Sequence, residues 1–209
     1  MKNEPLFKYI AVAGLSAVIL AFASAAHAAD PDGKEITRTG TYTTSQGGSG
    51  TASSVTTRSQ GVVSRQGSWT NAAGGKGTWQ TQANWNKSAG TATLSGSATR
   101  PNGATTSWQG TATRTAPGSI SEKGTITTAA GKQATFTSTD TRAAPGSWDK
   151  QETITTAAGK TIDRTVDTTV ANGKGSRTVT TTLPDGNTVT REGSFTQTVA
   201  PLPAPAPTP

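Results

Sequence analysis

The sequence predicts an all-β chain: an antiparallel up-and-down meander of about twelve strands, built from 28-residue β-hairpin repeats. The clearest sign is the octapeptide Thr-Ile-Thr-Thr-Ala-Ala-Gly-Lys, which occurs at 125–132 and again, unchanged, 28 residues later at 153–160. Segments of about ten residues, rich in Thr, Val, Ile and aromatics, alternate with turn sequences such as Pro-Asn-Gly and Ala-Pro-Gly. The sequence leaves open whether this sheet is a twisted ribbon, a rolled sheet or a closed barrel.

Glycines at the expected turns follow the same interval. One set falls at Gly47, Gly75, Gly103, Gly131 and Gly159, and Gly186 follows after 27 residues. A second set lies about midway between members of the first, at Gly61, Gly90, Gly118 and Gly146. Each repeat therefore contains two turns and two strands, which is one hairpin.

The order of apolar residues predicts which face of the sheet is buried. Side chains alternate between the faces of a strand, so the parity of a position gives its face. Between 92 and 170 the apolar residues are mostly even, and Thr, Ser and Gln occupy the odd positions. After the 27-residue step the apolar positions become odd (Val179, Val189, Phe195), as a one-residue change of register requires.

The predicted buried face also carries charge and glycine in a recurring order. The order apolar–Arg–Gly–aromatic, at spacing two, occurs at Ile36–Tyr42, Val63–Trp69 and Val189–Phe195. We expect rings to lie over the glycines of neighbouring strands and guanidinium groups to stack on rings. A three-residue loop at 130–132 places Ile126 opposite Phe136, Gly124 opposite Ser138 and Glu122 opposite Asp140. Arg114 and Arg142 are then the candidates to neutralise these carboxylates.

The N-terminus is typical of an exported protein. Lys2 and Lys8 precede an apolar stretch that ends at Ala26-His27-Ala28, which predicts a signal peptide over 1–28 with cleavage after Ala28. We expect a lead-in at 29–35, the hairpin repeat domain at 36–199 and a Pro-rich disordered tail at 200–209. Without a cysteine for lipid attachment, the predicted location is the periplasm or the exterior.

Composition excludes most catalytic chemistry. The chain has no cysteine, and its one histidine and one methionine lie in the predicted signal peptide. A protein without imidazole or thiol has no Ser-His triad, no cysteine nucleophile and no ordinary zinc or haem site. The glycine-rich stretches lack the Gly-Lys-Ser/Thr ending of a phosphate loop. We therefore predict a non-enzymatic protein with no cofactor, metal or nucleotide.

The leading functional hypothesis is a structural or interaction protein of the cell envelope or exterior. Repeated hairpins with threonine ladders suit a spacer or a self-associating protein. The Thr/Ser/Gln face and the lack of aromatic girdles argue against a lipid-embedded barrel, so we expect a protein that is not integral to a membrane after cleavage. An ice-binding or adhesin-like surface protein is a third hypothesis.

The alternative hypothesis is a binding module for an envelope polysaccharide, lipopolysaccharide or another polyanion. Between 36 and 121 there are seven basic residues and no acidic one, together with four of the five tryptophans. Cations interleaved with indoles attract anions and stack on rings. The candidate binding residues are Arg58, Arg65, Trp69, Trp79, Trp85, Lys87, Arg100 and Trp108.

Overall fold

The computed structural model describes residues 33–202, which form twelve β-strands. The strands have between 9 and 14 residues each. The strands are β1 (Lys34–Thr44), β2 (Ser49–Ser59), β3 (Val62–Asn71), β4 (Lys76–Asn86), β5 (Thr91–Thr99), β6 (Thr105–Ala116), β7 (Ser119–Thr127), β8 (Gln133–Ala144), β9 (Ser147–Thr156), β10 (Thr161–Ala171), β11 (Lys174–Thr182) and β12 (Thr188–Pro201).

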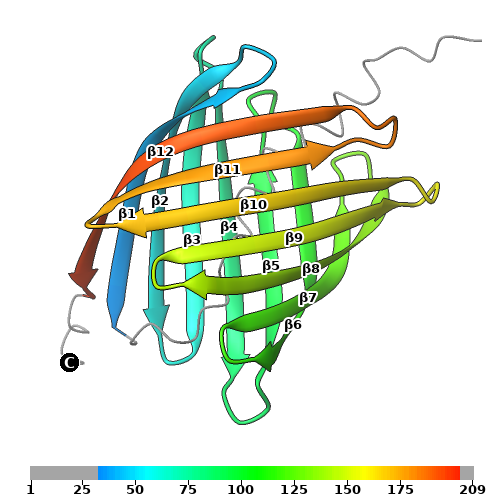
Figure 1. The fold of residues 1–209 in the computed structure, drawn as a ribbon. Coiled ribbons are helices and arrows are strands. Elements are labelled where there is room, and N and C mark those ends of the chain that lie inside the picture. Colours follow the sequence, from blue (N-terminus) through cyan, green and yellow to red (C-terminus); the bar gives the residue numbers. More distant parts are fainter. Residues whose placement is uncertain (1–32, 203–209) are drawn as a thin grey trace, which may run out of the picture.

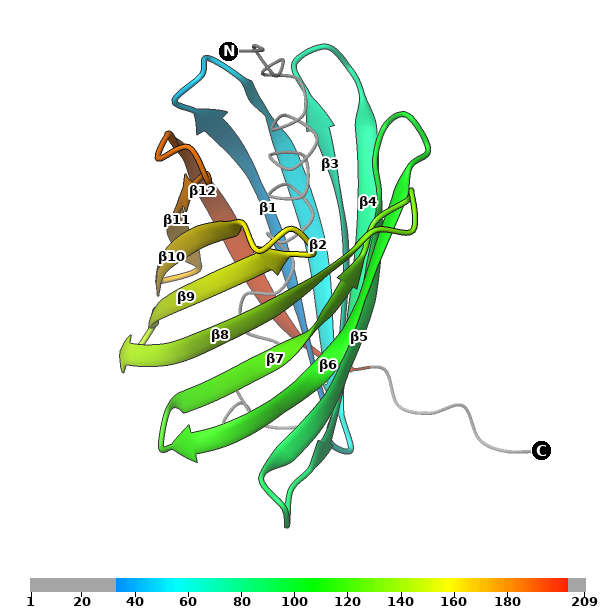
Figure 2. The same ribbon diagram turned by 90° about the vertical axis from the view of Figure 1, so that its right-hand side faces the viewer.

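The meander closes into a barrel. Every strand pairs antiparallel with its neighbours in sequence, and β1 also pairs with β12, from Lys34 opposite Pro201 to Thr44 opposite Arg191. Strands β8 to β12 pass obliquely in front of β2 to β5 (Figure 1), and the side view shows the same tilt of one wall against the other (Figure 2). The predicted all-β meander is confirmed, and pairing of the first and last strands decides the question of closure.

The turns at the two ends of the barrel differ in length. At one end, six turns share one hydrogen-bond pattern. The N–H of the first turn residue donates to the carbonyl oxygen of the fifth, as the N–H of Thr128 does to the carbonyl of Lys132. At the other end, where β1 begins and β12 ends, four of the five turns have two residues, such as Asn172-Gly173 with φ of 51° and 71°, and the β4–β5 turn has four, at 87–90. Positive φ at both central residues is the geometry that favours Asn-Gly.

The turn between β7 and β8 corrects the predicted register. Because Thr128 and Lys132 close the hairpin, Ile126 lies opposite Ala134, Gly124 opposite Phe136 and Glu122 opposite Ser138. The prediction from a three-residue loop is wrong by two positions on β8. A shift of two keeps every side chain on its predicted face.

The inner face of the barrel is apolar at both ends. One cluster lies toward the longer turns and contains Ala98, Trp108, Ile126, Phe136, Ile154 and Ile162. A second lies toward the shorter turns and contains Val63, Ala83, Ala92, Leu94, Ala112 and Ile120. The outer face is formed mainly by Thr, Ser and Gln, as the alternating burial of each strand shows.

Glycines on the inner face accommodate aromatic rings from adjacent strands. Gly67 lies opposite Trp79, Gly77 opposite Trp69, and Gly124 opposite Phe136. A Cβ at Gly67 would meet the Trp79 ring at 2.6 Å, and one at Gly124 would meet Phe136 Cε1 at 2.6 Å. The expected arrangement of rings over glycine backbone is therefore present, and it fixes the position of each ring.

The described residues, 33–202, contain the predicted repeat domain but only part of the segments predicted on either side of it. β1 begins at Lys34, two residues before the predicted start at Ile36, and β12 continues through Pro201. The predicted signal peptide and most of the lead-in and Pro-rich tail lie outside the described residues.

Candidate functional site

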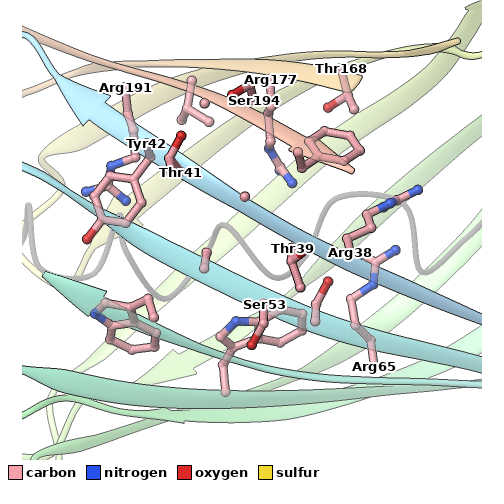
Figure 3. A pocket seen from close by; sticks show the side chains of 18 residues that line it. Arg38, Thr39, Thr41, Tyr42, Ser53, Arg65, Thr168, Arg177, Arg191 and Ser194 are labelled. Carbon is pink, nitrogen blue, oxygen red and sulfur yellow. The ribbon is translucent and has the colours of Figure 1, made fainter. Parts of the chain in front are cut away.

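Four arginines line a cavity on one wall of the barrel. Arg38 on β1, Arg65 on β3, Arg177 on β11 and Arg191 on β12 surround a space of about 160 Å³ (Figure 3). The closing pair β1·β12 brings together residues that are far apart in the sequence. Aromatic side chains complete the lining, namely Tyr42, Trp69, Trp79 and Phe195.

Two of these arginines stack on aromatic rings. The Arg38 guanidinium carbon lies 5.4 Å from the centre of the Phe195 ring, and Arg38 Nε donates a 2.8 Å hydrogen bond to Gln197 Oε1. The guanidinium carbon of Arg191 lies 5.1 Å from the centre of the Tyr42 ring. Stacking fixes the plane of each guanidinium without neutralising its charge.

Arg65 and Arg177 are the other two arginines of the cavity. Arg65 is buried and donates from Nε to Thr56 Oγ1 at 2.9 Å. The buried Nε and Nη2 atoms of Arg177 have no hydrogen-bond partner among residues 33–202. Arg65 is repelled by the charges of Arg38, Arg58 and Arg177, and Asp140 attracts both Arg65 and Arg177. Cations therefore dominate the electrostatics of this wall.

The wall formed by β7–β10 carries buried ion pairs instead. Lys150 Nζ lies 2.6 Å from Glu122 Oε2, which also accepts a 3.0 Å hydrogen bond from Ser138 Oγ. Arg164 Nη2 lies 2.8 Å from Glu152 Oε2. The expectation that Arg114 and Arg142 neutralise Glu122 and Asp140 is wrong, because both arginines are exposed and Glu122 pairs with Lys150.

The arrangement favours an anionic ligand that carries a ring. Several guanidinium groups attract and orient carboxylate or phosphate, and aromatic faces stack on flat or apolar ring surfaces. Among residues 33–202 no group of three or more His, Asp or Glu side chains is placed to hold a metal ion. The same residues contain no helix long and apolar enough to cross a membrane.

The structure separates the sequence-predicted binding residues into three groups. Arg65, Trp69 and Trp79 line the cavity, as the polyanion hypothesis requires of a binding site. Trp108 and Trp85 instead pack in the two apolar clusters, and Arg58 is buried beside the turn at Gln60. Lys87 and Arg100 lie at turns.

Sequence reasoning missed Arg38, Arg177, Arg191, Tyr42 and Phe195 as candidate binding residues. Four of them belong to the repeated Arg–Gly–aromatic pattern at 36–42 and 189–195, which does predict stacked arginines. A basic stretch without acidic residues extends over 36–121 and does not include Arg177, Arg191 or Phe195, which closure brings close to β1. Arg38 and Tyr42 lie within that stretch, and the repeated Arg–Gly–aromatic pattern is the signal that singles them out.

A closed antiparallel barrel with an even number of strands occurs both in outer-membrane proteins and in soluble proteins such as lipocalins. Solved structures support the first of these classes. The chain is similar to the KdgM porin, with a TM-score of 0.58 and 7% identity over 78% of this chain and 98% of that chain. It is also similar to a KdgM porin in complex with disordered oligogalacturonate, with a TM-score of 0.56 and 7% identity over 78% and 97% of the two chains. No family model and no curated protein matches the sequence.

This likeness corrects several predictions. The leading hypothesis of a structural or self-associating repeat protein is wrong, and so is the third hypothesis of an ice-binding or adhesin-like surface protein, because the repeats close into a barrel with the fold of a porin. The same finding contradicts the predicted periplasmic or secreted location and the prediction that the protein is not integral to a membrane. The prediction of a non-enzymatic protein is confirmed, since the solved structures that share the fold are porins.

Proposed function

We propose that this chain is a porin-type barrel of the bacterial outer membrane that admits anionic solutes, with acidic oligosaccharides as its substrate class. The observation that carries the proposal is the group of four arginines on the inner wall of a closed barrel. Cations on the wall of a confined lumen raise the local concentration of anions and exclude cations.

Two further observations support the proposal. A solved porin of similar fold is described in complex with oligogalacturonate, an acidic sugar polymer. β1 also begins and β12 ends at the end of the barrel that has the shorter turns, and bacterial outer-membrane barrels have short periplasmic turns and longer external loops. In this orientation the end with the longer turns faces the cell exterior.

The outer face is what most distinguishes this barrel from known outer-membrane barrels. Those proteins present an apolar band to lipid, whereas Thr, Ser and Gln dominate the outer positions here. Each hydroxyl or amide facing hydrocarbon carries a desolvation cost. Membrane location is therefore the first part of the proposal to measure.

The location test follows the natural full-length chain in its own cells, separated into periplasmic, outer-membrane and medium fractions. The outer-membrane fraction is then washed with urea and with alkaline carbonate, which remove peripheral proteins. The proposal requires the barrel to remain with the membrane after both washes. Recovery in the periplasm or the medium would contradict membrane insertion.

The transport test reconstitutes the purified barrel in a planar lipid bilayer under a potassium chloride gradient. An arginine-lined lumen predicts a reversal potential that reports preference for chloride, together with a decrease in current when oligogalacturonate is added. A neutral oligosaccharide of equal length serves as the control. A channel that prefers cations, or the absence of conductance, would contradict the transport proposal.

A further inference from the structure

We propose that the cavity is a discrete binding site for one acidic sugar unit, with Arg177 as the side chain that binds its carboxylate. This inference rests on the proposed function, because it takes its substrate class from there. It adds that the lumen holds its ligand at one defined place on one wall.

Among the arginines of the cavity, Arg177 has two buried nitrogens without a hydrogen-bond partner in the described chain, Nε and Nη2, and Arg191 has one. A buried donor without a partner costs roughly 1–3 kcal/mol, which a ligand carboxylate can recover by accepting from both nitrogens. Nε and one terminal nitrogen of a guanidinium form a fork that matches a single carboxylate.

The neighbouring arginines are already held in place by the protein. Phe195 and Gln197 fix Arg38, Thr56 fixes Arg65, and Tyr42 stacks on Arg191. These contacts leave the positive charges facing the cavity. The three side chains therefore supply a preorganised field, so that little reorganisation is needed when an anion arrives.

The aromatic lining favours a sugar ring over a bare anion. Trp79 lies over Gly67 and Trp69 over Gly77, where any larger residue would displace the ring. Rings fixed in this way offer stacking surfaces for the apolar face of a pyranose. An inorganic phosphate or a polyphosphate has no such face.

The size of the cavity favours a single sugar unit. Its volume of about 160 Å³ is smaller than the roughly 300–1,000 Å³ of pockets that hold drug-sized ligands. On the wall at β7–β10, Lys150 and Arg164 lie beside the carboxylates of Glu122 and Glu152, so an anionic ligand there would meet negative charge. Further units of an oligosaccharide therefore lie outside the cavity along the lumen.

The test measures binding of trigalacturonate to the purified wild-type barrel by quenching of tryptophan fluorescence and by calorimetry. We expect Arg177→Gln to weaken binding about 10- to 100-fold, the range for loss of a charged hydrogen bond. Arg177→Lys keeps the charge but loses the two-nitrogen fork, so its affinity for trigalacturonate should lie between those of the wild type and Arg177→Gln. Arg142→Gln, exposed and outside the cavity, is the matched control and should bind as the wild type does.

Other ligands and a second variant decide the remaining points. Maltotriose, which is neutral, and inorganic polyphosphate should each bind more weakly than trigalacturonate, and equal binding of either would overturn the inference. If Arg177→Gln unfolds, Phe195→Leu must weaken trigalacturonate binding with the thermal transition retained. Wild-type binding that Arg177→Gln leaves unchanged would overturn only the inferred site. Failure of the wild type to bind trigalacturonate would overturn the substrate class of the proposed function as well.

Discussion

The two charged walls of the lumen carry similar cationic side chains, but these side chains have different neighbours. On β7–β10, Lys150 and Arg164 each face a carboxylate on a nearby strand. On β1, β3, β11 and β12, arginines face aromatic rings, hydroxyls and one another, and Asp140 of β8 attracts Arg65 and Arg177. A buried cation matched to a carboxylate maintains the fold, whereas cations gathered around a cavity remain able to bind an anion.

Removing one carboxylate from the paired wall should have the largest effect on stability. Glu122→Gln removes the carboxylate that lies 2.6 Å from buried Lys150 Nζ, and loss of one member of a buried pair costs about 3–5 kcal/mol. Chemical denaturation followed by tryptophan fluorescence measures the change in the free energy of unfolding. Glu192→Gln, at an exposed position, is the control. A loss below that of the control variant would mean that the pair contributes nothing.

A methyl group added on the wall that carries the four cavity arginines should have the next largest effect on stability. In Gly77→Ala the new Cβ overlaps the Trp69 ring, and overpacking of this kind costs about 1–3 kcal/mol. The displaced ring also lines the cavity, so trigalacturonate binding should weaken. The double variant Gly77→Ala/Trp69→Leu tests the cause, because removing the ring should recover part of the lost stability. Strictly additive losses would contradict the steric explanation.

A substitution in the turn between the two walls should have a smaller effect on stability. Asn172-Gly173 joins β10 to β11, and there the inward positions change from even to odd numbers. Because Asn172 has a φ of 51°, Asn172→Ala should cost about 1–2 kcal/mol in the free energy of unfolding. Asn172→Gly should keep wild-type stability, since glycine adopts this conformation freely. Equal thermal midpoints for the two variants would contradict this explanation.

Arginines outside both walls should have the smallest effect. Arg114→Gln and Arg142→Gln change exposed side chains, and each should alter the free energy of unfolding by less than about 0.5 kcal/mol. The same denaturation measurement applies. A loss comparable to that of Glu122→Gln would restore the sequence-based hypothesis that these arginines neutralise the buried carboxylates.

Much of the fold follows from local pattern. The 28-residue interval predicts the hairpins, and the parity of apolar residues predicts the inner face between 92 and 195. The Arg–Gly–aromatic order predicts rings over glycines, which the pairs Gly67–Trp79 and Gly124–Phe136 confirm. These features depend only on alternation along a strand and on immediate neighbours.

The ion pairs and the cavity depend on contacts that local pattern does not specify. Glu122 and Lys150 lie on β7 and β9, one full repeat apart, with β8 between them. A two-residue error in the register of β8 is therefore enough to suggest the wrong partners. The cavity requires β1 to meet β12, and no repeat or turn in the sequence specifies that pairing.

The pairing of β1 with β12 also makes the starting point of the chain arbitrary. Lys34 lies opposite Pro201, so a short linker can join residues 33 and 202 while new termini are opened at the turn containing Gly131. Such a circular permutant retains all twelve strand pairings. The cyclic order of the strands, rather than which strand is made first, thus defines the barrel.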